Sequence, residues 1–375
     1  MIVRRPFRLA LLAALPLLVA TACGERRPQS PADAPDTSGA SAAAQLRQSI
    51  ETATFSPPAP DSSSTGQPPV SGPVTPTSPT DQPGPVGRVL PDDARPDPTL
   101  VRVQVLLDRT RFSPGIIDGL GGQNTRQAIA AFETANGLTV DGELDPAVFE
   151  RLTSGDSGRV LIDYTITAAD VAGPFIGTVP SDLEAMARLE TVGYADAREA
   201  LAEKFHMTEA LLDALNPGAD FTRAGQPLVV AQTGPKSLQG EVSRIVVNKA
   251  EQSVRAFAAD GTLLAFYPAT IGSSEMPSPS GSYTVRAIAP EPNYTYDPSR
   301  VSYGKGGGKV VVPAGPNNPV GSVWIDLSRD TYGIHGTPEP EKIGKTASSG
   351  CVRLTNWDVE QLAGAVKAGV AVRFT

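Results

Sequence analysis

The chain has 375 residues, which is too long for one ordinary domain and predicts two or three. The formal net charge is −8 and only 19% of the residues are charged, so the basic surface that nucleic-acid-binding proteins need is not expected. With 36 Pro and 36 Gly, much of the chain is unsuited to a packed core.

The sequence contains only two cysteines and two histidines, and no pair of them has metal-ligand spacing. A zinc site would then need carboxylates for most of its ligands, which is an uncommon arrangement. We therefore expect no metal and no cofactor.

Residues 1–22 predict an export signal. Three arginines precede an apolar run over residues 9–20, which has the length of a signal peptide and is shorter than a spanning helix. Cys23 directly follows Ala20-Thr21-Ala22, and this arrangement resembles a bacterial lipoprotein signal with Cys23 lipidated after cleavage. Ala20 stands where such signals usually carry Leu, so ordinary cleavage at an A-x-A site stays open, as does a twin-arginine route. Each alternative predicts an exported protein of the periplasm or cell envelope, held at a membrane if Cys23 is lipidated.

Residues 23–97 predict a disordered linker. Pro, Ser, Thr, Ala and Gly dominate this segment, and it has too few large apolar residues to offset the entropy cost of ordering. Residues 42–54 could form a helical turn or two, but they lack a strong apolar stripe.

Residues 98–155 predict three short helices. The first opens the unit, the second is capped by Asn124 or Thr125 and ends near Gly137, and the third starts at Asp145-Pro146. The turns and apolar positions resemble the peptidoglycan-binding domain of cell-wall enzymes, which implies a small three-helix bundle. The matching residues are Val105-Leu106-Leu107, Ile117-Asp118-Gly119, Thr125, Ala128, Phe132, Asn136-Gly137-Leu138 and Val140-Asp141-Gly142.

Residues 159–233, here named the middle module, predict an α+β unit. A strand over 161–166 is followed by a helix over 195–205, a helix over 209–215 capped by Thr208, and a short strand over 228–230. This order resembles a divergent LysM module, a glycan-binding unit. His206 is expected to be a structural residue rather than a ligand.

Residues 240–375 predict a mainly-β domain that ends in a helix. Thr355 to Asp358 fits a capping box and opens a helix over about 357–367, while residues 294–309 predict a long irregular loop. The expected strands cover residues 243–248, 253–258, 263–270, 310–313, 323–327 and 331–335. Residues 277–285 predict a Pro/Ser/Gly turn that leads into a further strand.

Cys351 and His335 are the candidate catalytic pair of this domain. A thiolate is a strong nucleophile, and a neighbouring histidine can hold a cysteine in that form. Gly336 and Gly350 flank the pair and allow close backbone approach. Backbone N–H groups around Gly350 and Cys351 could form an oxyanion hole, a contribution often of about 3–4 kcal/mol. By itself, Cys351 is equally compatible with a buried structural cysteine.

The sequence around these residues closely resembles the L,D-transpeptidase catalytic domain of the YkuD type. The motif runs from His335-Gly336 to Ser348-Ser349-Gly350-Cys351-Val352-Arg353-Leu354, Asn356 and Asp358, and Pro279-Ser280-Gly281-Ser282-Tyr283 matches an upstream turn of the family. Ser349 departs from the family pattern, which often has His there, so the local tuning of pKa values could differ.

The resemblance implies that Cys351 is the nucleophile and that His335 acts as base and then as acid, oriented by a backbone carbonyl near Gly336. Arg353 would lie beside the site, where it either meets a substrate carboxylate or forms an ion pair with an acid such as Asp358. Tyr332 either lines the pocket or is an ordinary strand residue.

The implied reaction is peptidoglycan cross-linking. Cys351 would form an acyl-thioester with a tetrapeptide stem and release D-alanine, and an amine of another stem or of a protein would accept the acyl group. Two alternatives stay open, namely a carboxypeptidase that uses water as acceptor and a non-catalytic lipoprotein that only binds the cell wall. The expected partners are peptidoglycan stems and glycan, with no nucleic acid.

Overall fold

The computed structural model describes residues 37–55, 95–156, 158–272, 276–300, 308–348 and 350–375. The predicted leader, Cys23, Ser349 and most of the predicted linker lie outside these residues. Within them, no helix is both long and apolar enough to cross a membrane.

Helix α1 (Thr37–Thr52) corrects the prediction of a disordered linker over this part of residues 23–97. Ala43 and Ile50 are buried and Leu46 packs beside the core, which is an apolar stripe at helical spacing. Arg47 donates to the carbonyl of Leu215, and Glu51 accepts from the N–H of Leu161 at 2.8 Å. Docking on the middle module therefore orders a helix whose own stripe is weak.

Three helices follow in residues 98–155, namely α2 (Pro98–Arg109), α3 (Gln123–Asn136) and α4 (Pro146–Gly155). Asp97 and Asp145 cap α2 and α4 directly before a proline, and Gly137 ends α3 in the left-handed region at φ 67°. The predicted cap of α3 was wrong, because its N-cap is Gly122, which has no side chain to donate or accept.

The middle module has a two-stranded sheet and three short helices. β1 (Leu161–Thr165) pairs antiparallel with β2 (Pro227–Ala231), with Leu161 opposite Ala231. Between them lie α5 (Leu183–Met186), α6 (Ala197–Lys204) and α7 (Glu209–Leu215), and Thr208 caps α7 as predicted.

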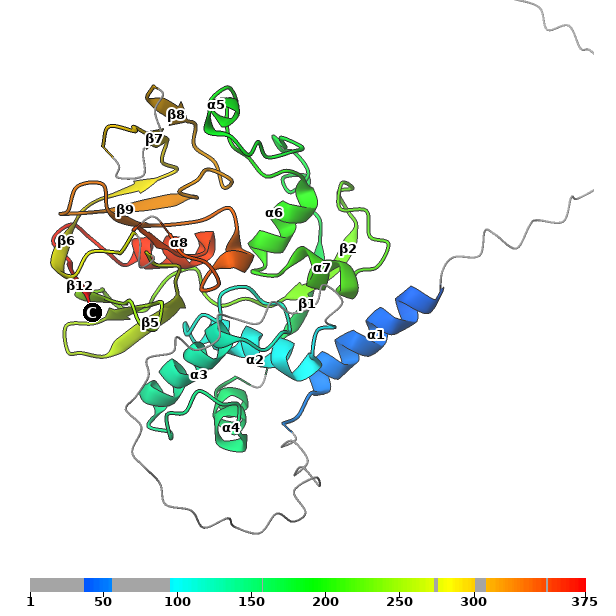
Figure 1. The fold of residues 1–375 in the computed structure, drawn as a ribbon. Coiled ribbons are helices and arrows are strands. Elements are labelled where there is room, and N and C mark those ends of the chain that lie inside the picture. The colour runs from blue at the N-terminus through cyan, green and yellow to red at the C-terminus, as the bar shows by residue number, and fades with distance from the viewer. Residues whose placement is uncertain (1–36, 56–94, 157, 273–275, 301–307, 349) are drawn as a thin grey trace, which may run out of the picture. The chain divides into compact units, whose positions relative to one another are not determined.

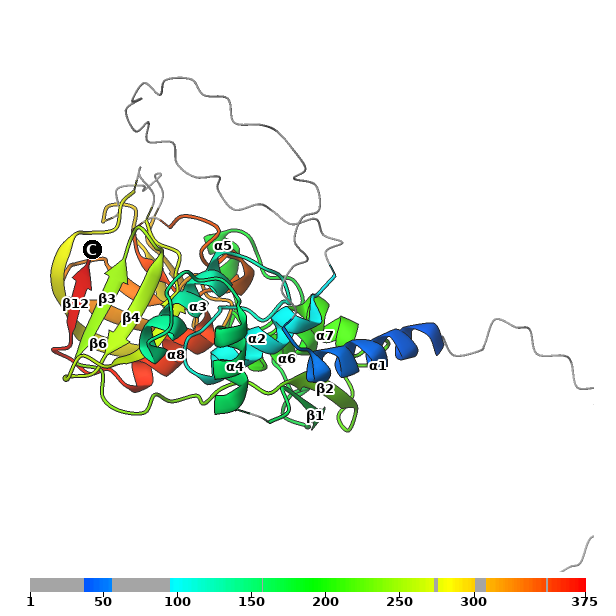
Figure 2. The same cartoon turned by 90° about the horizontal axis from the view of Figure 1, so that it is seen from below.

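An eight-stranded sheet in the order β11-β10-β9-β6-β12-β3-β4-β5 forms the C-terminal domain (Figures 1 and 2). Only the pairs β10–β11 and β12–β3 are parallel. The strands are β3 (Arg244–Asn248), β4 (Ser253–Phe257), β5 (Leu263–Pro268), β6 (Gly281–Pro290), β9 (Val323–Leu327), β10 (Gly333–His335), β11 (Val352–Arg353) and β12 (Ala371–Phe374).

The predicted irregular loop over residues 294–309 needs a correction. β7 (Tyr294–Tyr296) pairs antiparallel with β8 (Val310–Val312) and forms a second, separate sheet. A strand of three residues is too short to show the alternation by which strands are predicted from sequence.

Helix α8 (Asn356–Gly364) packs against β9 and β10 (Figure 1). Val359 and Leu362 of α8 join Ile325 and Ile334 of these strands in the core of the domain. The helix thus buries its apolar face behind β10, the strand that carries His335.

Candidate active site

The register of β10 and β11 places three predicted site residues on one face. The strands are parallel, with Ile334 opposite Val352 and His335 opposite Arg353. Because side chains alternate along a strand, Cys351 shares the face of Arg353, and therefore that of His335. All three line one pocket of about 880 Å³.

His335 is held in one tautomer. Its side chain is buried, with 3% exposed, and its Nδ1 lies 2.7 Å from the carbonyl oxygen of Gly336. A carbonyl only accepts, so Nδ1 carries the proton and Nε2 of the neutral ring keeps its lone pair. The Trp324 ring stacks on the imidazole with centroids 5.3 Å apart. The predicted orientation by a carbonyl at Gly336 is present, and in this tautomer Nε2 carries the lone pair that a base needs.

Burial sets the protonation of both candidate catalytic groups. It lowers the pKa of His335 to about 3, with a smaller contribution from the positive charge of Arg353, and the carbonyls of Gly336 and Val320 oppose this shift. Burial raises the pKa of the Cys351 thiol above its ordinary value, against the opposing effects of the Gly333 N–H and Arg353. Burial thus favours a neutral thiol and a neutral imidazole in the resting pair, and activation of Cys351 by His335 stays a prediction.

The turn before Cys351 is fixed by two serines. Ser278 Oγ donates to the carbonyl of Gly350 at 2.6 Å, and Ser348 Oγ donates to the carbonyl of Cys351 at 2.5 Å. The N–H of Gly350, at φ +116°, donates to Ser348 Oγ at 3.1 Å. Gly350 is therefore not a free oxyanion donor in this structure, whereas that role for the Cys351 N–H stays a prediction.

Arg353 and Tyr332 both line the pocket of Cys351. Arg353 forms no ion pair with Asp358, whose carboxylate accepts a hydrogen bond from Ser113 Oγ at 3.0 Å instead. The Tyr332 ring covers Gly350, because a Cβ at Gly350 would lie 3.1 Å from the ring. Arg353 is thus available to a ligand, and Tyr332 is part of the wall.

Sequence reasoning missed several residues of this site. Trp324 carried no local signal, and Thr331, whose carbonyl accepts from the Cys351 thiol at 3.5 Å, adopts a rare left-handed backbone at φ 68°. Strand β7 was missed, whereas β8 falls on the predicted strand over residues 310–313. The residues near these strands that line the pocket are Asn293, Tyr294, Thr295, Tyr296, Asp297, Arg300 and Lys309.

Among the described residues, no group of three or more His, Cys, Asp or Glu side chains could hold a metal ion.

Two family models match the chain. The L,D-transpeptidase catalytic domain matches residues 243–373, and a peptidoglycan binding domain matches residues 96–152.

Curated relatives carry the same family name. The Bacillus licheniformis protein named as the L,D-transpeptidase YkuD is 30% identical over 179 residues, which cover 47% of this chain and 92% of that protein. The Escherichia coli protein named as the L,D-transpeptidase ErfK/SrfK is 35% identical over 165 residues, which cover 42% of this chain and 52% of that protein. The chain thus spans about half the length of this second relative.

Among solved structures, L,D-transpeptidase 3 from Mycobacterium tuberculosis aligns with a TM-score of 0.30 and 17% identity, over 40% of this chain and 75% of that one.

Proposed function

Because this chain belongs to the L,D-transpeptidase family, we propose that it is a cysteine-dependent acyltransferase that cross-links peptidoglycan or anchors proteins to it. The observation that carries this proposal is the pocket shared by Cys351 and His335. One residue supplies a nucleophile and the other an unprotonated Nε2, which are the two groups that acyl transfer through a thioester needs.

The proposed first half-reaction begins with proton transfer from the Cys351 thiol to Nε2 of His335. The sulfur attacks the carbonyl carbon that links the third stem residue, an L-centre such as diaminopimelate, to D-alanine. The C–N bond then breaks, the D-alanine nitrogen takes the proton from Nε2, and an acyl-thioester remains on Cys351.

In the second half-reaction, an amine attacks the thioester and passes its proton to Nε2 of His335. The C–S bond breaks, the sulfur recovers a proton, and the new amide is the cross-link. With water in place of the amine, the same steps give a carboxypeptidase. Throughout, the Gly336 carbonyl stabilises the transient imidazolium through Nδ1.

The site favours an enzyme over a protein that only binds the wall. Binding alone would not require an imidazole with an unprotonated Nε2 in the same pocket as a thiol. Arg353 lines the same pocket without an acidic partner among the described residues, and we assign it to a carboxylate of the stem peptide.

The leader and the helical unit support a place in the cell envelope. We propose that residues 1–22 direct export, that Cys23 is lipidated, and that residues 98–155 bind peptidoglycan near the catalytic domain. Export by either route would deliver the chain to the compartment that holds this substrate.

The test uses the chain from residue 24 onward, in which Cys351 is the only cysteine. Incubation with tetrapeptide muropeptides should release D-alanine and give a cross-linked dimer, read by mass spectrometry; a tripeptide product would indicate water as acceptor. Intact-protein mass should also show the acyl-enzyme.

The variant Cys351→Ala should lower D-alanine release by about 10³-fold or more, because the nucleophile is lost. Thr346→Ala, at an exposed position of the loop between His335 and Cys351, is the matched control. Undiminished release by Cys351→Ala would rule out the thioester mechanism, and no release by the wild type would rule out the function.

A further inference from the structure

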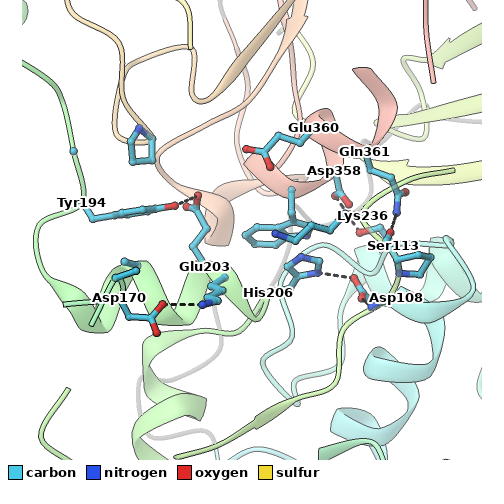
Figure 3. A pocket seen from close by; sticks show the side chains of 18 of the residues that line it. Asp108, Ser113, Asp170, Tyr194, Glu203, His206, Lys236, Asp358, Glu360 and Gln361 are labelled. Atoms are coloured by element: carbon cyan, nitrogen blue, oxygen red, sulfur yellow. Dashed lines mark hydrogen bonds and ion pairs between the residues drawn. The ribbon is translucent and has the colours of Figure 1, made fainter. Parts of the chain in front are cut away.

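A second pocket, of about 510 Å³, lies away from Cys351 where the helical unit, the middle module and α8 meet (Figure 3). Its lining includes Glu203 of α6, whose Oε1 accepts from Tyr194 OH at 3.0 Å, as Figure 3 shows. The same oxygen accepts from Asn356 Nδ2 at 2.9 Å, across 153 residues of sequence. Glu203 thereby connects the middle module to the first residue of α8.

Asn356 uses its whole side-chain amide to join three segments. Besides Glu203, its Nδ2 donates to the carbonyl of Pro316 at 3.2 Å, and its Oδ1 accepts from the N–H of Ser322 at 3.0 Å. The residue is 1% exposed, so the loss of any of these bonds would leave a buried polar group unpaired. Its rotamer is therefore fixed by its partners, Glu203 among them.

The Asn356 amide packs directly against the peptide that orients the catalytic base. A Cβ atom at Gly336 would overlap Asn356 Oδ1, so only glycine allows this approach. The carbonyl of the same Gly336 holds Nδ1 of His335 at 2.7 Å. A shift of Asn356 would thus move the acceptor that selects the tautomer of His335.

An independent set of contacts joins the segment from Asn317 to Val320, beside His335, to the middle module. Asn317 Nδ2 donates to Glu199 Oε1 at 2.9 Å and to the carbonyl of Gly193 at 3.1 Å, and its N–H donates to the carbonyl of Val192 at 3.0 Å. Three residues further on, Val320 lines the pocket of Cys351. The Val320 carbonyl raises the pKa of His335, against the larger effect of burial. The middle module therefore braces both backbone segments that touch the imidazole.

We propose that Glu203 of the middle module is a positioning residue for His335, and that it acts through Asn356 and Gly336. The middle module then sets the geometry of the catalytic base in addition to any role in binding glycan. Its effect on turnover rests on the proposed function, whereas its effect on the tautomer of His335 does not.

The test compares Glu203→Leu, which removes the acceptor, with Glu203→Gln, which keeps an oxygen for Asn356 and Tyr194. Glu203→Leu should lower kcat about 10-fold or more and change KM less than about twofold, because a misplaced base affects the chemical step. Glu203→Gln should restore most of kcat. The exposed Glu360, which lines the same pocket, provides the control variant Glu360→Gln.

A readout that does not depend on activity is ¹⁵N NMR of histidine-labelled chain from residue 24. The sequence has only two histidines, and His335→Gln assigns their signals. The wild type should show His335 with the proton on Nδ1 alone, and Glu203→Leu should show a mixture of tautomers. Where Glu203→Leu does not fold, Glu203→Asp replaces it, since its shorter side chain withdraws the oxygen from Asn356.

An unchanged His335 signal in Glu203→Leu, or an equal loss of kcat in Glu203→Gln and Glu203→Leu, would overturn the positioning role. If the wild type releases no D-alanine, the proposed function fails, and the tautomer of His335 still decides whether Glu203 positions it.

Discussion

Cys351 and His335 rest as a neutral pair because both are desolvated. Burial disfavours a charged imidazole and a charged thiolate alike, so their neutral forms persist at pH 7. In the proposed mechanism, the Cys351 thiolate then forms only as the thiol passes its proton to His335. A neutral thiol also resists oxidation and alkylation better than a resident thiolate would.

This protonation state predicts a slow reaction of Cys351 with iodoacetamide. In the chain from residue 24, the rate at pH 7 should be below that of a free cysteine, because the raised pKa reduces the thiolate fraction. The rate should keep rising as the pH passes 9. The urea-unfolded chain is the control, and a plateau below pH 8 in the folded protein would contradict the prediction.

At the scale of elements, α8 shows which parts of a local prediction hold. Thr355 caps the helix as predicted, and its Oγ1 accepts from the N–H of Asp358 at 3.2 Å. The Asp358 carboxylate, however, accepts from Ser113 of the helical unit at 3.0 Å. The capping pattern therefore located the start of α8. The hydrogen-bond partner of the Asp358 carboxylate, however, is Ser113, which lies far away in the sequence.

Asp358 should make the stability of the protein depend on pH. Burial raises the pKa of Asp358 to about 7 from its ordinary value of 3.8, so the folded state keeps a proton that the unfolded state has lost. The protonated Asp358 carboxyl therefore stabilises the folded protein at pH 4, and this contribution is lost as the pH rises to about 7. Glu203, with a pKa raised to about 7 mainly by burial, acts in the same direction.

Asp358→Asn should flatten this decline and raise the Tm at pH 8 more than at pH 4. An effect on the order of a few kcal/mol at pH 8 is expected, since one pKa unit corresponds to about 1.4 kcal/mol. Thermal unfolding from pH 4 to 8 measures it, with Glu360→Gln as the exposed control. Parallel stability curves for Asp358→Asn and the wild type would show that Asp358 does not titrate as stated.

At the scale of the molecule, the described residues between 38 and 375 form one compact unit. The N–H of Ile117 donates to the carbonyl of His206 at 2.7 Å, and the N–H of Ser113 donates to the carbonyl of Phe266 at 2.9 Å. These bonds join the helical unit to the middle module and to the sheet. The helical unit, the middle module and the C-terminal domain are therefore packed against one another rather than joined only by linkers.

Helix α1 belongs to this unit, and Ile50→Ala should test its docking. Ile50 is fully buried, so truncation should lower the free energy of unfolding by about 2–4 kcal/mol. Gln48→Ala, on the exposed face of α1, should change it by less than about 0.5 kcal/mol. Urea unfolding of the chain from residue 24 measures both, and equal values for the two variants would mean that α1 is not docked.

The sequence by itself determined the features that depend on neighbouring residues or on family motifs. The two family resemblances, to the L,D-transpeptidase catalytic domain and to the peptidoglycan-binding domain, are confirmed by the matching models. The LysM-like reading of the middle module stays a prediction. Caps at Asp145, Thr208 and Thr355 were predictable because each involves residues within one helical turn.

Only the tertiary structure decided how these parts act on one another. The bond between Glu203 and Asn356 joins residues 153 positions apart, and no periodicity records such a pairing. The resting protonation of Cys351 and His335 depends on desolvation, which exists only once the strands and α8 have closed around them. Local pattern thus identified the candidate catalytic residues, and long-range packing set their charge and geometry.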